Sequence, residues 1–342
     1  MRISLLFAII LSATNGILCQ NASGYEVPVK VETIYHFNSS VSLEKLAIRK
    51  SGEAIVGFDN SPNLYQVDPD LINGSVRHIH TFEGYSVVHG ILEVEDDQFY
   101  VAASNLSVWT HIDVLGSPSI FHVNMTGFPE HPARVREVVH FPNARILNGM
   151  EVISKEEGLI YVGDSALGVI NILNVNTGHH YMAINNSYTT IYPLDSGNGV
   201  YGIHLFQPQN DSTKYLYLSN FQQGIIARVP IHPSSGLPVG EPKVVVSNLT
   251  TVAEFALDKE GNIFAALLSL NQFVRVDHKT KEVLVLAGGP DIDTYTKAIS
   301  VAFGRTESDK GKLYAVTIGG FTALHNVGAG LFRLDTEDMA VV

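Results

Sequence analysis

Six positions recur along the chain, and all but the last carry a polar, acidic or imidazole side chain that could operate a site. They are Glu44, His89, Asn148, His204, Glu254 and Ala298. Carboxylate and amide oxygens are the ligands that a hard cation such as Ca²⁺ prefers. Imidazole and carboxylate groups also transfer protons or donate hydrogen bonds to a carbonyl group. Because two histidines suit Ca²⁺ poorly, a metal site, a proton-transfer site and an inert polar channel all stay open as interpretations.

Each of these residues begins a repeated unit of three short strands. In the first unit, Leu43–Pro69, strands are expected at Leu46–Arg49, Ala54–Phe58 and Leu64–Val67, separated by turns. Five altered copies follow, and successive units start 44 to 59 residues apart. A repeat of this length made of short strands is typical of the blades of a β-propeller.

A fourth, outer strand is expected in five of the units, at Ser75–His80, Ser119–His122, His180–Ile184, Lys243–Val246 and Glu282–Leu286. The third strand of the second unit is expected at Val108–Asp113. The sixth unit has no outer strand of its own, and Val29–Phe37 can supply it, which closes the ring and leaves no long exposed sheet edge. The sequence therefore predicts an all-β, six-bladed β-propeller with four antiparallel strands per blade, in one domain over 29–342. Two stacked β-sandwiches are the alternative, but they do not explain six similar units.

The inner strand of each propeller blade lines the central channel. The six recurring residues are therefore expected to converge at one mouth of that channel. We predict that His89, His204 and Glu254 are catalytic residues that donate or accept protons. Beside them, the residues expected to bind an organic substrate are Tyr85, Asn148, Tyr201, Phe221 and Phe255.

The composition excludes one class of partner. Of the 342 residues, 45% are hydrophobic and 16% are charged, and the net charge is −12. Nucleic-acid binding requires a basic face, so no nucleic-acid partner is expected. After the N-terminus, no segment approaches the roughly 18–20 apolar residues that a membrane-spanning helix needs, so no membrane span is expected either.

The N-terminus has the pattern of a secretory signal peptide. Arg2 precedes an apolar run over Ile3–Leu11 and small residues near Cys19, which predicts a signal peptide over 1–19 and a flexible lead over 20–28. Asn-x-Ser/Thr sequons, the acceptors of N-linked glycans, agree with this route and lie at Asn21, Asn38, Asn73, Asn105, Asn124, Asn185, Asn210 and Asn248. We therefore expect a glycoprotein of the secretory pathway, either secreted or vesicular.

Several segments of the chain resemble one family of propellers. They are Ser42–Arg49, Leu147–Met150, Gly163–Gly168, Tyr201–His204, Tyr217–Asn220 and Glu254–Asp258. On these segments the chain is similar to the senescence-marker/gluconolactonase-like six-bladed propellers, in their secreted fungal branch. The similarity covers nearly the whole chain after the predicted signal peptide and lead.

The resemblance implies two enzymatic functions. Most of the family are lactone hydrolases with one divalent cation, whose ligands correspond to Glu44, Asn148 and Glu254, the last in place of an Asp. The fungal branch is also similar to the hetero-Diels–Alderases of tropolonic sesquiterpenoid biosynthesis. These join a tropolone-type quinone methide to an apolar terpene such as humulene, and that reaction requires no cofactor. We favour this second function. The alternatives are a lactonase that depends on Ca²⁺ or another divalent cation, and a non-catalytic, secreted ligand-binding propeller.

Overall fold

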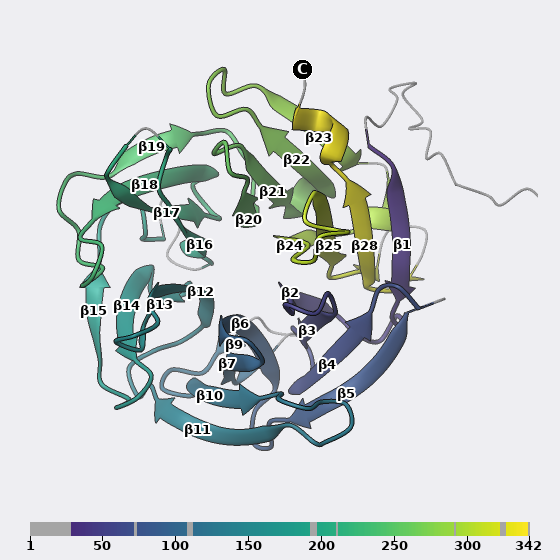
Figure 1. The fold of residues 1–342 in the computed structure, drawn as a ribbon, viewed down its shortest axis with the longest axis horizontal. Helices are drawn as coiled ribbons and strands as arrows, with labels where there is room; N and C mark the ends of the chain where they lie inside the picture. The colour runs from purple at the N-terminus through teal and green to yellow at the C-terminus, as the bar shows by residue number, and fades with distance from the viewer. Residues whose placement is uncertain are drawn as a thin grey trace, which may run out of the picture.

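The fold is a ring of six antiparallel sheets around a central channel. The computed structural model describes residues 29–71, 74–107, 112–191, 197–209, 211–290, 292–321 and 326–340. Each sheet has four strands, and the sheets follow one another around the ring in chain order (Figure 1). This arrangement confirms the predicted all-β, six-bladed propeller. The predicted signal peptide and flexible lead lie outside the described residues.

Blades 1 to 3 are formed by the first half of the chain, and their strands are given from the channel outward. Blade 1 contains β2 (Leu43–Ile48), β3 (Ala54–Phe58), β4 (Asn63–Asp68) and β5 (Ser75–Thr81). Blade 2 contains β6 (Val87–Glu95), β7 (Gln98–Ser104), β10 (Ser119–Asn124) and β11 (Arg134–His140). Blade 3 contains β12 (Leu147–Ser154), β13 (Leu159–Asp164), β14 (Val169–Asn174) and β15 (His180–Ile184).

Blades 4 to 6 complete the ring in the same way. Blade 4 contains β16 (Val200–Phe206), β17 (Lys214–Asn220), β18 (Ile225–Ile231) and β19 (Lys243–Val246). Blade 5 contains β20 (Val252–Leu257), β21 (Ile263–Leu267), β22 (Gln272–Val276) and β23 (Val283–Gly288). Blade 6 contains β24 (Ala298–Phe303), β25 (Lys312–Thr317), β28 (Gly330–Asp335) and β1 (Val31–His36).

A few short elements lie outside the six sheets. Two small hairpins are formed by β8 (Leu106–Ser107) with β9 (Ile112–Asp113), and by β26 (Gly320–Phe321) with β27 (Asn326–Val327). Three 3-10 helices are η1 (Leu268–Leu270), η2 (Asp293–Tyr295) and η3 (Glu337–Ala340).

The first strand of the described chain closes the ring. β1 pairs antiparallel with β28, for example Val31 with Leu334, so it is the outermost strand of blade 6 (Figure 1). An ion pair supports the closure, because Arg333 Nη2 on β28 lies 2.8 Å from Glu32 Oε2 on β1. The predicted pairing of Val29–Phe37 with the sixth unit is therefore confirmed.

Blade 2 differs from the strand assignment predicted from the sequence. Its third strand is β10 and its outermost strand is β11, whereas the pattern placed the third strand at Val108–Asp113 and the outer one at Ser119–His122. Leu106–Ser107 and Ile112–Asp113 form a separate hairpin instead. All side chains of β11 are exposed or half-buried, so its sequence lacks the apolar alternation that would predict a strand.

Apolar side chains between neighbouring blades form the core. Between blades 1 and 2, for example, Ile55, Val88 and Phe99 are fully buried in one cluster. A strand that is covered on both faces reads as a continuous apolar run, as β3 and β21 do. This stacking fixes the inner strands, and with them the side chains that face the channel.

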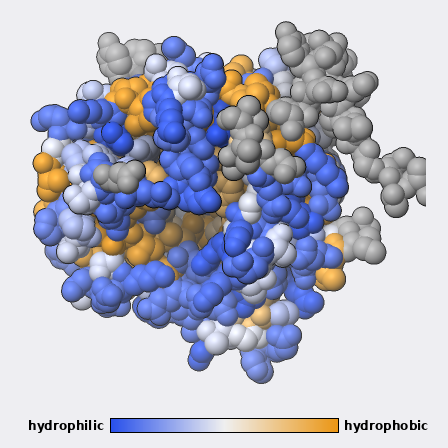
Figure 2. All heavy atoms as spheres, turned by 45° about the horizontal axis from the view of Figure 1, so that its top comes forward, coloured by the Kyte–Doolittle hydropathy of each residue, from blue (hydrophilic) through white to orange (hydrophobic). Residues whose placement is uncertain are grey.

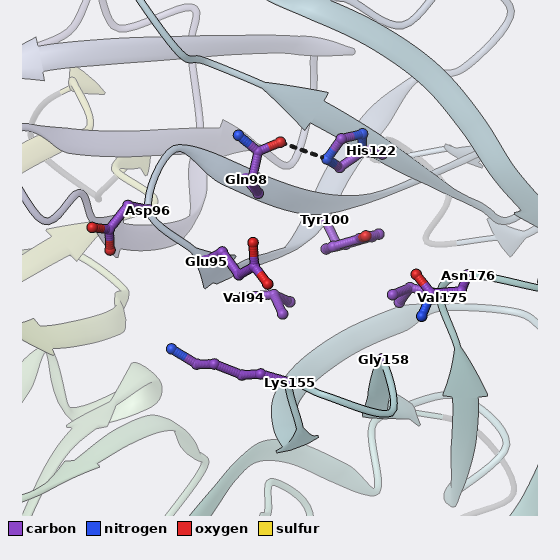
Figure 3. Close-up of a pocket in the computed structure, with 10 residues that line it drawn as sticks. All are labelled: Val94, Glu95, Asp96, Gln98, Tyr100, His122, Lys155, Gly158, Val175 and Asn176. Carbon is purple, nitrogen blue, oxygen red and sulfur yellow. Dashed lines mark hydrogen bonds between the residues drawn. The ribbon is translucent and has the colours of Figure 1, made fainter.

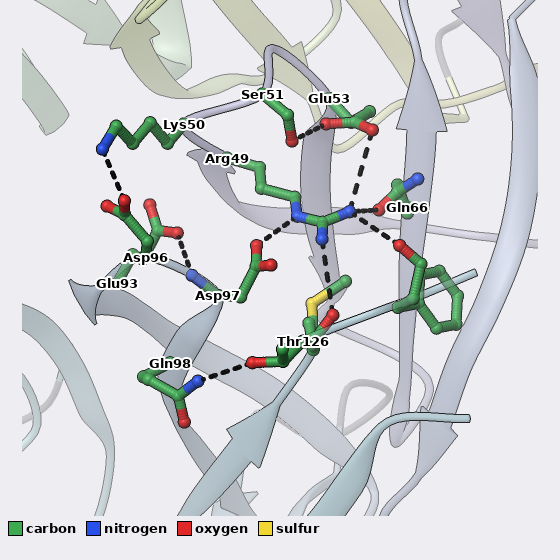
Figure 4. Close-up of polar contacts among 12 residues, drawn as sticks. Arg49, Lys50, Ser51, Glu53, Gln66, Glu93, Asp96, Asp97, Gln98 and Thr126 are labelled. Atoms are coloured by element: carbon green, nitrogen blue, oxygen red, sulfur yellow. Dashed lines mark hydrogen bonds and ion pairs between the residues drawn. The ribbon is translucent and has the colours of Figure 1, made fainter. Parts of the chain in front are cut away.

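A buried arginine adds a polar connection between blades 1 and 2, which we call the Arg49 cluster (Figure 4). Arg49 follows β2, and its guanidinium donates to Asp97 Oδ1 at 2.6 Å and to Gln66 Oε1 at 3.2 Å. It also donates to the backbone carbonyls of Phe128 at 3.2 Å and Met125 at 3.3 Å. Because a buried charge is costly without such partners, these bonds fix the loops around Arg49 against one another.

Candidate functional site

The six inner strands share one irregularity near their starts. In each, the pairing with the second strand skips one or two residues, as in a β-bulge. A bulge bends its strand and re-aims the side chains there. The first skipped residue of each strand defines six equivalent positions around the axis, which we call the axial ring: Glu44, His89, Asn148, Tyr201, Ala253 and Ile299.

The axial ring contains three of the six residues predicted to open the inner strands: Glu44, His89 and Asn148. The other three lie elsewhere on their strands. His204 is three residues beyond the ring position of β16, Glu254 is one residue beyond that of β20, and Ala298 is one residue before that of β24. The sequence shows which side chains are polar, whereas the position of a bulge depends on backbone pairing with the next strand.

Most of the axial ring borders a cavity of about 910 Å³, which we call the upper cavity. Its polar lining includes Glu44, Asp59, His89, Asn148 and Tyr201, and its apolar lining includes Leu106, Ile146, Phe221, Leu268, Ile299 and Ile318. Figure 2 shows a hollow in the middle of the ring, with hydrophobic residues in its wall and a mainly hydrophilic surface around it. A pocket of this size, in which apolar side chains and converging polar groups share the lining, is a candidate small-molecule site.

Further along the same inner strands lies a second axial cavity of about 350 Å³, the lower cavity. Its ionisable lining residues are Lys45, Glu93, Glu151, His204, Glu254 and Arg305. The three predicted catalytic residues are therefore divided between the cavities. His89 borders the upper cavity, and His204 and Glu254 border the lower one.

Between the two cavities lies a buried group of polar side chains, which we call the axial cluster. Toward the upper cavity, Tyr201 Oη and Asn148 Nδ2 both donate to Glu44 Oε1, the latter at 3.1 Å. Toward the lower cavity, Lys45 Nζ donates to Glu254 Oε2 and, at 3.4 Å, to Asn148 Oδ1. The Asn148 amide thus connects a carboxylate to an ammonium group, and side chains from blades 1, 3, 4 and 5 meet at the axis.

His204 extends the axial cluster into the lower cavity. Its Nε2 lies 3.0 Å from Glu254 Oε1, and its Nδ1 lies 3.3 Å from Glu151 Oε2. Both ring nitrogens therefore have carboxylate partners. The ring also packs edge-on against Phe255, with 4.9 Å between centroids. Phe255 is fully buried in the core, so this predicted substrate-binding residue lies behind His204 and does not line the upper cavity.

His89 is the histidine of the upper cavity, and it is 3% exposed. Its Nε2 lies 3.1 Å from Asp59 Oδ1. Burial opposes protonation of the imidazole, but the hydrogen bond to Asp59 and the charge of Glu44 together raise the pKa of His89 above its ordinary value. Its Nδ1 is buried without a hydrogen-bond partner among the described residues. Buried polar atoms are normally paired, so this unpaired nitrogen distinguishes His89 from His204, whose two ring nitrogens both have carboxylate partners.

Burial shifts the pKa values of the axial cluster as well. It raises the pKa of Glu44, although the charge of His89 opposes the shift. It also raises the pKa of Tyr201 well above its ordinary value, and the Glu44 charge acts in the same direction. It lowers the pKa of Lys45 to about 8. At neutral pH, Tyr201 therefore stays protonated and most Lys45 side chains keep their positive charge.

The remaining predicted substrate-binding residues lie in two places. Phe221 lines the upper cavity, and its ring stacks on that of Tyr201 with 5.6 Å between centroids. Tyr85 packs against the core between blades 1 and 2, where its Oη donates to Ser119 Oγ at 2.9 Å. The structure therefore brings Asn148, Tyr201 and Phe221 together and places Tyr85 apart from them.

Lys45 is the residue of the site that the sequence analysis missed. A regular strand turns neighbouring side chains to opposite faces, so Lys45 would face away from a channel that Glu44 faces. The register shift between Leu43 and Lys45 removes that alternation. The sequence does contain a signal for Lys45. Glu44 and Lys45 are the two charged residues in the otherwise apolar segment Leu43–Ile48, and a buried lysine needs a partner of opposite charge.

The family resemblance implies metal ligands at Glu44, Asn148 and Glu254. Two of these three hold Lys45, because Asn148 Oδ1 and the Glu254 carboxylate both accept hydrogen bonds from its ammonium group. A divalent cation between them would lie beside a buried positive charge, so these side chains as arranged do not fit one. Among the residues described, no group of three or more His, Cys, Asp or Glu side chains is placed to hold a metal ion.

A cavity of about 580 Å³ lies away from the axis, between blades 2 and 3 (Figure 3). His122 in its wall is already paired with Gln98, Nε2 to Oε1 3.0 Å, and packs against the Tyr100 ring at 5.1 Å. Burial and the charge of Arg136 lower the pKa of His122. Among the described residues that line this cleft, none has a buried side-chain nitrogen or oxygen without a partner, as His89 does, so we place the candidate site at the axis.

Comparison with known proteins gives one relative with a stated activity. No family model matches the chain. The chain is 23% identical over 323 residues to a protein of Phoma sp. described as a candidate hetero-Diels–Alderase, and the match covers 84% of this chain and 86% of that protein.

Solved structures with the same fold include two that cover most of both chains. A luciferin-regenerating enzyme is 14% identical with a TM-score of 0.62, and covers 90% of this chain and 95% of its own. The calcium-binding protein regucalcin from Agrobacterium tumefaciens is 14% identical with a TM-score of 0.60, and covers 89% and 97%. At these identities the structural likeness shows the fold alone. Together with the Phoma protein, these matches confirm the predicted resemblance. In the part of the chain that the structure describes, no helix is long and apolar enough to cross a bilayer.

Proposed function

We propose that this chain is an enzyme that joins a tropolone-type quinone methide to an apolar terpene, such as humulene, by a hetero-Diels–Alder reaction in the upper cavity. The observation that carries the proposal is the wall of that cavity at His89. There a buried imidazole with an unpaired Nδ1 borders a chamber whose lining combines apolar and polar side chains. The similarity to the Phoma protein supports the same class of reaction.

This reaction requires the protein to position its substrates more than to supply reactive groups. The carbonyl oxygen and the exocyclic carbon of the quinone methide bond to the two alkene carbons of the terpene, and no atom is lost. Catalysis therefore consists of holding both partners in a near-attack geometry and keeping water away from the reactive diene. At about 910 Å³, the upper cavity is at the large end of small-molecule sites, which leaves room for both partners.

The residues that line the upper cavity have different proposed roles. Apolar side chains such as Ile146, Phe221 and Leu268 offer surface to the terpene. His89 Nδ1 donates a hydrogen bond to the quinone methide oxygen when the imidazole is protonated. If the diene forms from a hydroxymethyl precursor in the cavity, His89 gives its proton to the leaving hydroxyl and regains one from the ring hydroxyl of the precursor, so one water leaves. His204 and Glu254 are positioning residues, because they act through the axial cluster.

The test is a rate measurement with the precursor of a tropolone quinone methide and humulene. His89→Ala is expected to lower the enzyme-dependent rate by roughly 10²–10⁴-fold, the usual range for a lost proton-transfer group. His204→Ala is expected to cost less and to change the pH profile, because its nitrogens contact the carboxylates of the lower cavity. The matched control is His179→Ala, which alters an exposed histidine in the turn between β14 and β15.

The stereochemical outcome gives a second readout. The uncatalysed background reaction is expected to give a mixture, and the wild-type protein a single product. A wild-type rate and product mixture equal to background would contradict the proposed reaction. A fully active His89→Ala variant would remove His89 from the mechanism while leaving the reaction itself in place.

We also propose that the chain travels through the secretory pathway, as residues 1–19 and the sequons indicate. Among the described sequons, Asn38, Asn185 and Asn248 are exposed, and Asn105 and Asn124 are half-buried. The predicted sites Asn21, Asn73 and Asn210 lie outside the described residues. Expression in a fungal host should give protein whose gel mobility changes on glycosidase treatment, by less in Asn185→Gln and Asn248→Gln variants. Unmodified protein retained in the cytosol would contradict this route.

A further inference from the structure

The axial cluster already contains a cation that belongs to the chain itself. Lys45 reaches the axis from blade 1 and meets Asn148 from blade 3 and Glu254 from blade 5. The side chains of Lys45 and Glu254 are 6% and 4% exposed, so the ion pair is shielded from water. Carboxylate and amide oxygens are ligands that suit a divalent cation, and here the Glu254 carboxylate and the Asn148 amide oxygen contact an ammonium group instead.

The backbone is built to keep this arrangement. The bulge at the start of β2 turns two successive charged residues, Glu44 and Lys45, toward the axis, one bordering each cavity. On β16, a Cβ built on Gly202 would overlap Glu254 Oε1. Only glycine therefore lets the Glu254 carboxylate lie against β16, where Lys45 and His204 both reach it.

Charge decides which cation can occupy the cluster. A buried ammonium group neutralises Glu254, and Asn148 Oδ1 completes its contacts. A dication at the same point would share these acceptors with Lys45 and be repelled by it in a medium where charges are poorly screened. Lys45 would have to leave these acceptors for the metal to enter.

We propose that the Lys45 ammonium group is the resident cation of the axial cluster and takes the place of a divalent metal ion. The wild-type protein then binds no metal there, and removal of the Lys45 side chain creates a metal site from Glu44, Asn148 and Glu254. The inference concerns the same cavity as the proposed function, but it rests on the geometry of the ion pair. Its test measures metal binding and not turnover, so the two proposals can fail separately.

The experiment is a titration of full-length wild-type protein and Lys45→Ala with Ca²⁺ and with Mn²⁺ by calorimetry, after treatment with a chelator. The variant is expected to bind one equivalent of metal at a site that depends on Glu254. Its affinity there should be at least about tenfold higher than the affinity of the wild type for any metal whose binding Glu254→Gln abolishes. The electron paramagnetic resonance spectrum of Mn²⁺ should show the bound ion in the variant. Lys45→Arg keeps a cation at the axis and is expected to gain nothing.

The double variant Lys45→Ala/Glu254→Gln checks where the new ion binds, and it should lose the gained equivalent. Lys45→Met, which removes the charge but keeps much of the side-chain volume, replaces Lys45→Ala if alanine prevents folding. One equivalent of metal bound by the wild type and lost in Glu254→Gln would overturn the inference. Folded, charge-removed variants that gain no metal would overturn it as well.

Discussion

Lys45 and Arg49 are buried cations four residues apart on blade 1, and they are held in different ways. Arg49 donates to two backbone carbonyls and to side chains of blades 1 and 2 (Figure 4). In the described part of the chain, the acceptors of Lys45 are side chains that reach the axis from blades 3 and 5. Arg49 lies between blades, whereas Lys45 borders the lower cavity.

The kind of acceptor explains what each cation can do. The two backbone carbonyls lie in packed loops and cannot turn away from their donor, so they hold the Arg49 guanidinium in place and the Arg49 cluster serves stability. Carboxylate and amide side chains can rotate, so the axial cluster can respond to a ligand or to another cation. Of these two buried cations, Lys45 on β2 therefore supports the candidate site, and Arg49, just after β2, supports the fold.

The largest expected effect is the loss of stability on removing the Arg49 side chain. Arg49→Ala leaves Asp97, Gln66 and two backbone carbonyls without their donor, and is expected to cost about 3–5 kcal/mol of unfolding free energy. Denaturant titration measures the loss. The control is Lys50→Ala, because Lys50 and its partner Asp96 are 62% and 63% exposed, and it should cost no more than about 1 kcal/mol. Equal costs for both variants would remove the Arg49 cluster from the stability argument.

At the axis, breaking the ion pair should cost somewhat less, because side-chain acceptors can re-form contacts. Lys45→Met leaves Glu254 Oε2 without its ammonium partner, while His204 still contacts Oε1, and is expected to cost about 3 kcal/mol in a buffer with chelator. Adding Glu254→Gln should restore most of that stability, since the double variant buries no unpaired charge. The measurement is the same denaturant titration, arranged as a double-mutant cycle. A double variant less stable than Lys45→Met would contradict the pairing.

A smaller effect is expected from the backbone that supports Glu254. Gly202→Ala forces a methyl group against Glu254 Oε1 and should cost about 2 kcal/mol by overpacking. Gly289→Ala is the matched control, because its nearest neighbours would be Ile292 side-chain atoms at 3.6 Å, an ordinary contact. Thermal unfolding compares the two variants. The comparison fails if Gly202→Ala is as stable as Gly289→Ala.

The smallest effect depends on pH and concerns His89. Its pKa is raised in the folded state, so the stability from its contact with Asp59 is fully present below about pH 6.5 and is lost as the pH rises through the folded-state pKa. Asp59→Asn should therefore cost about 1 kcal/mol in mild acid and less in mild alkali. Unfolding titrations across this range give the difference. Asp96→Asn, at an exposed site, should show no such trend, and a cost for Asp59→Asn that grows with pH would contradict the assignment.

The sequence predicted the architecture better than the site. Six similar units and one extra strand were enough for the ring, because repeats and strand patterns are local features of a sequence. Glu44, His89 and Asn148 were placed correctly in the axial ring for the same reason. The prediction placed His204 and Glu254 at the channel mouth, whereas they border the lower cavity, and it missed Lys45. The position of each depends on a bulge, which is set by pairing with another strand. The β11 strand was missed because it buries little of its surface.

The closing strand has a consequence for the biogenesis of the protein. β1 is the partner of β28, so blade 6 joins the beginning of the described chain to its end. During synthesis, five blades can assemble while β1 is still unpaired. The ring can close only after β28 has left the ribosome. β1 therefore lacks its partner for most of translation, and an unpaired strand is a place where another chain can pair.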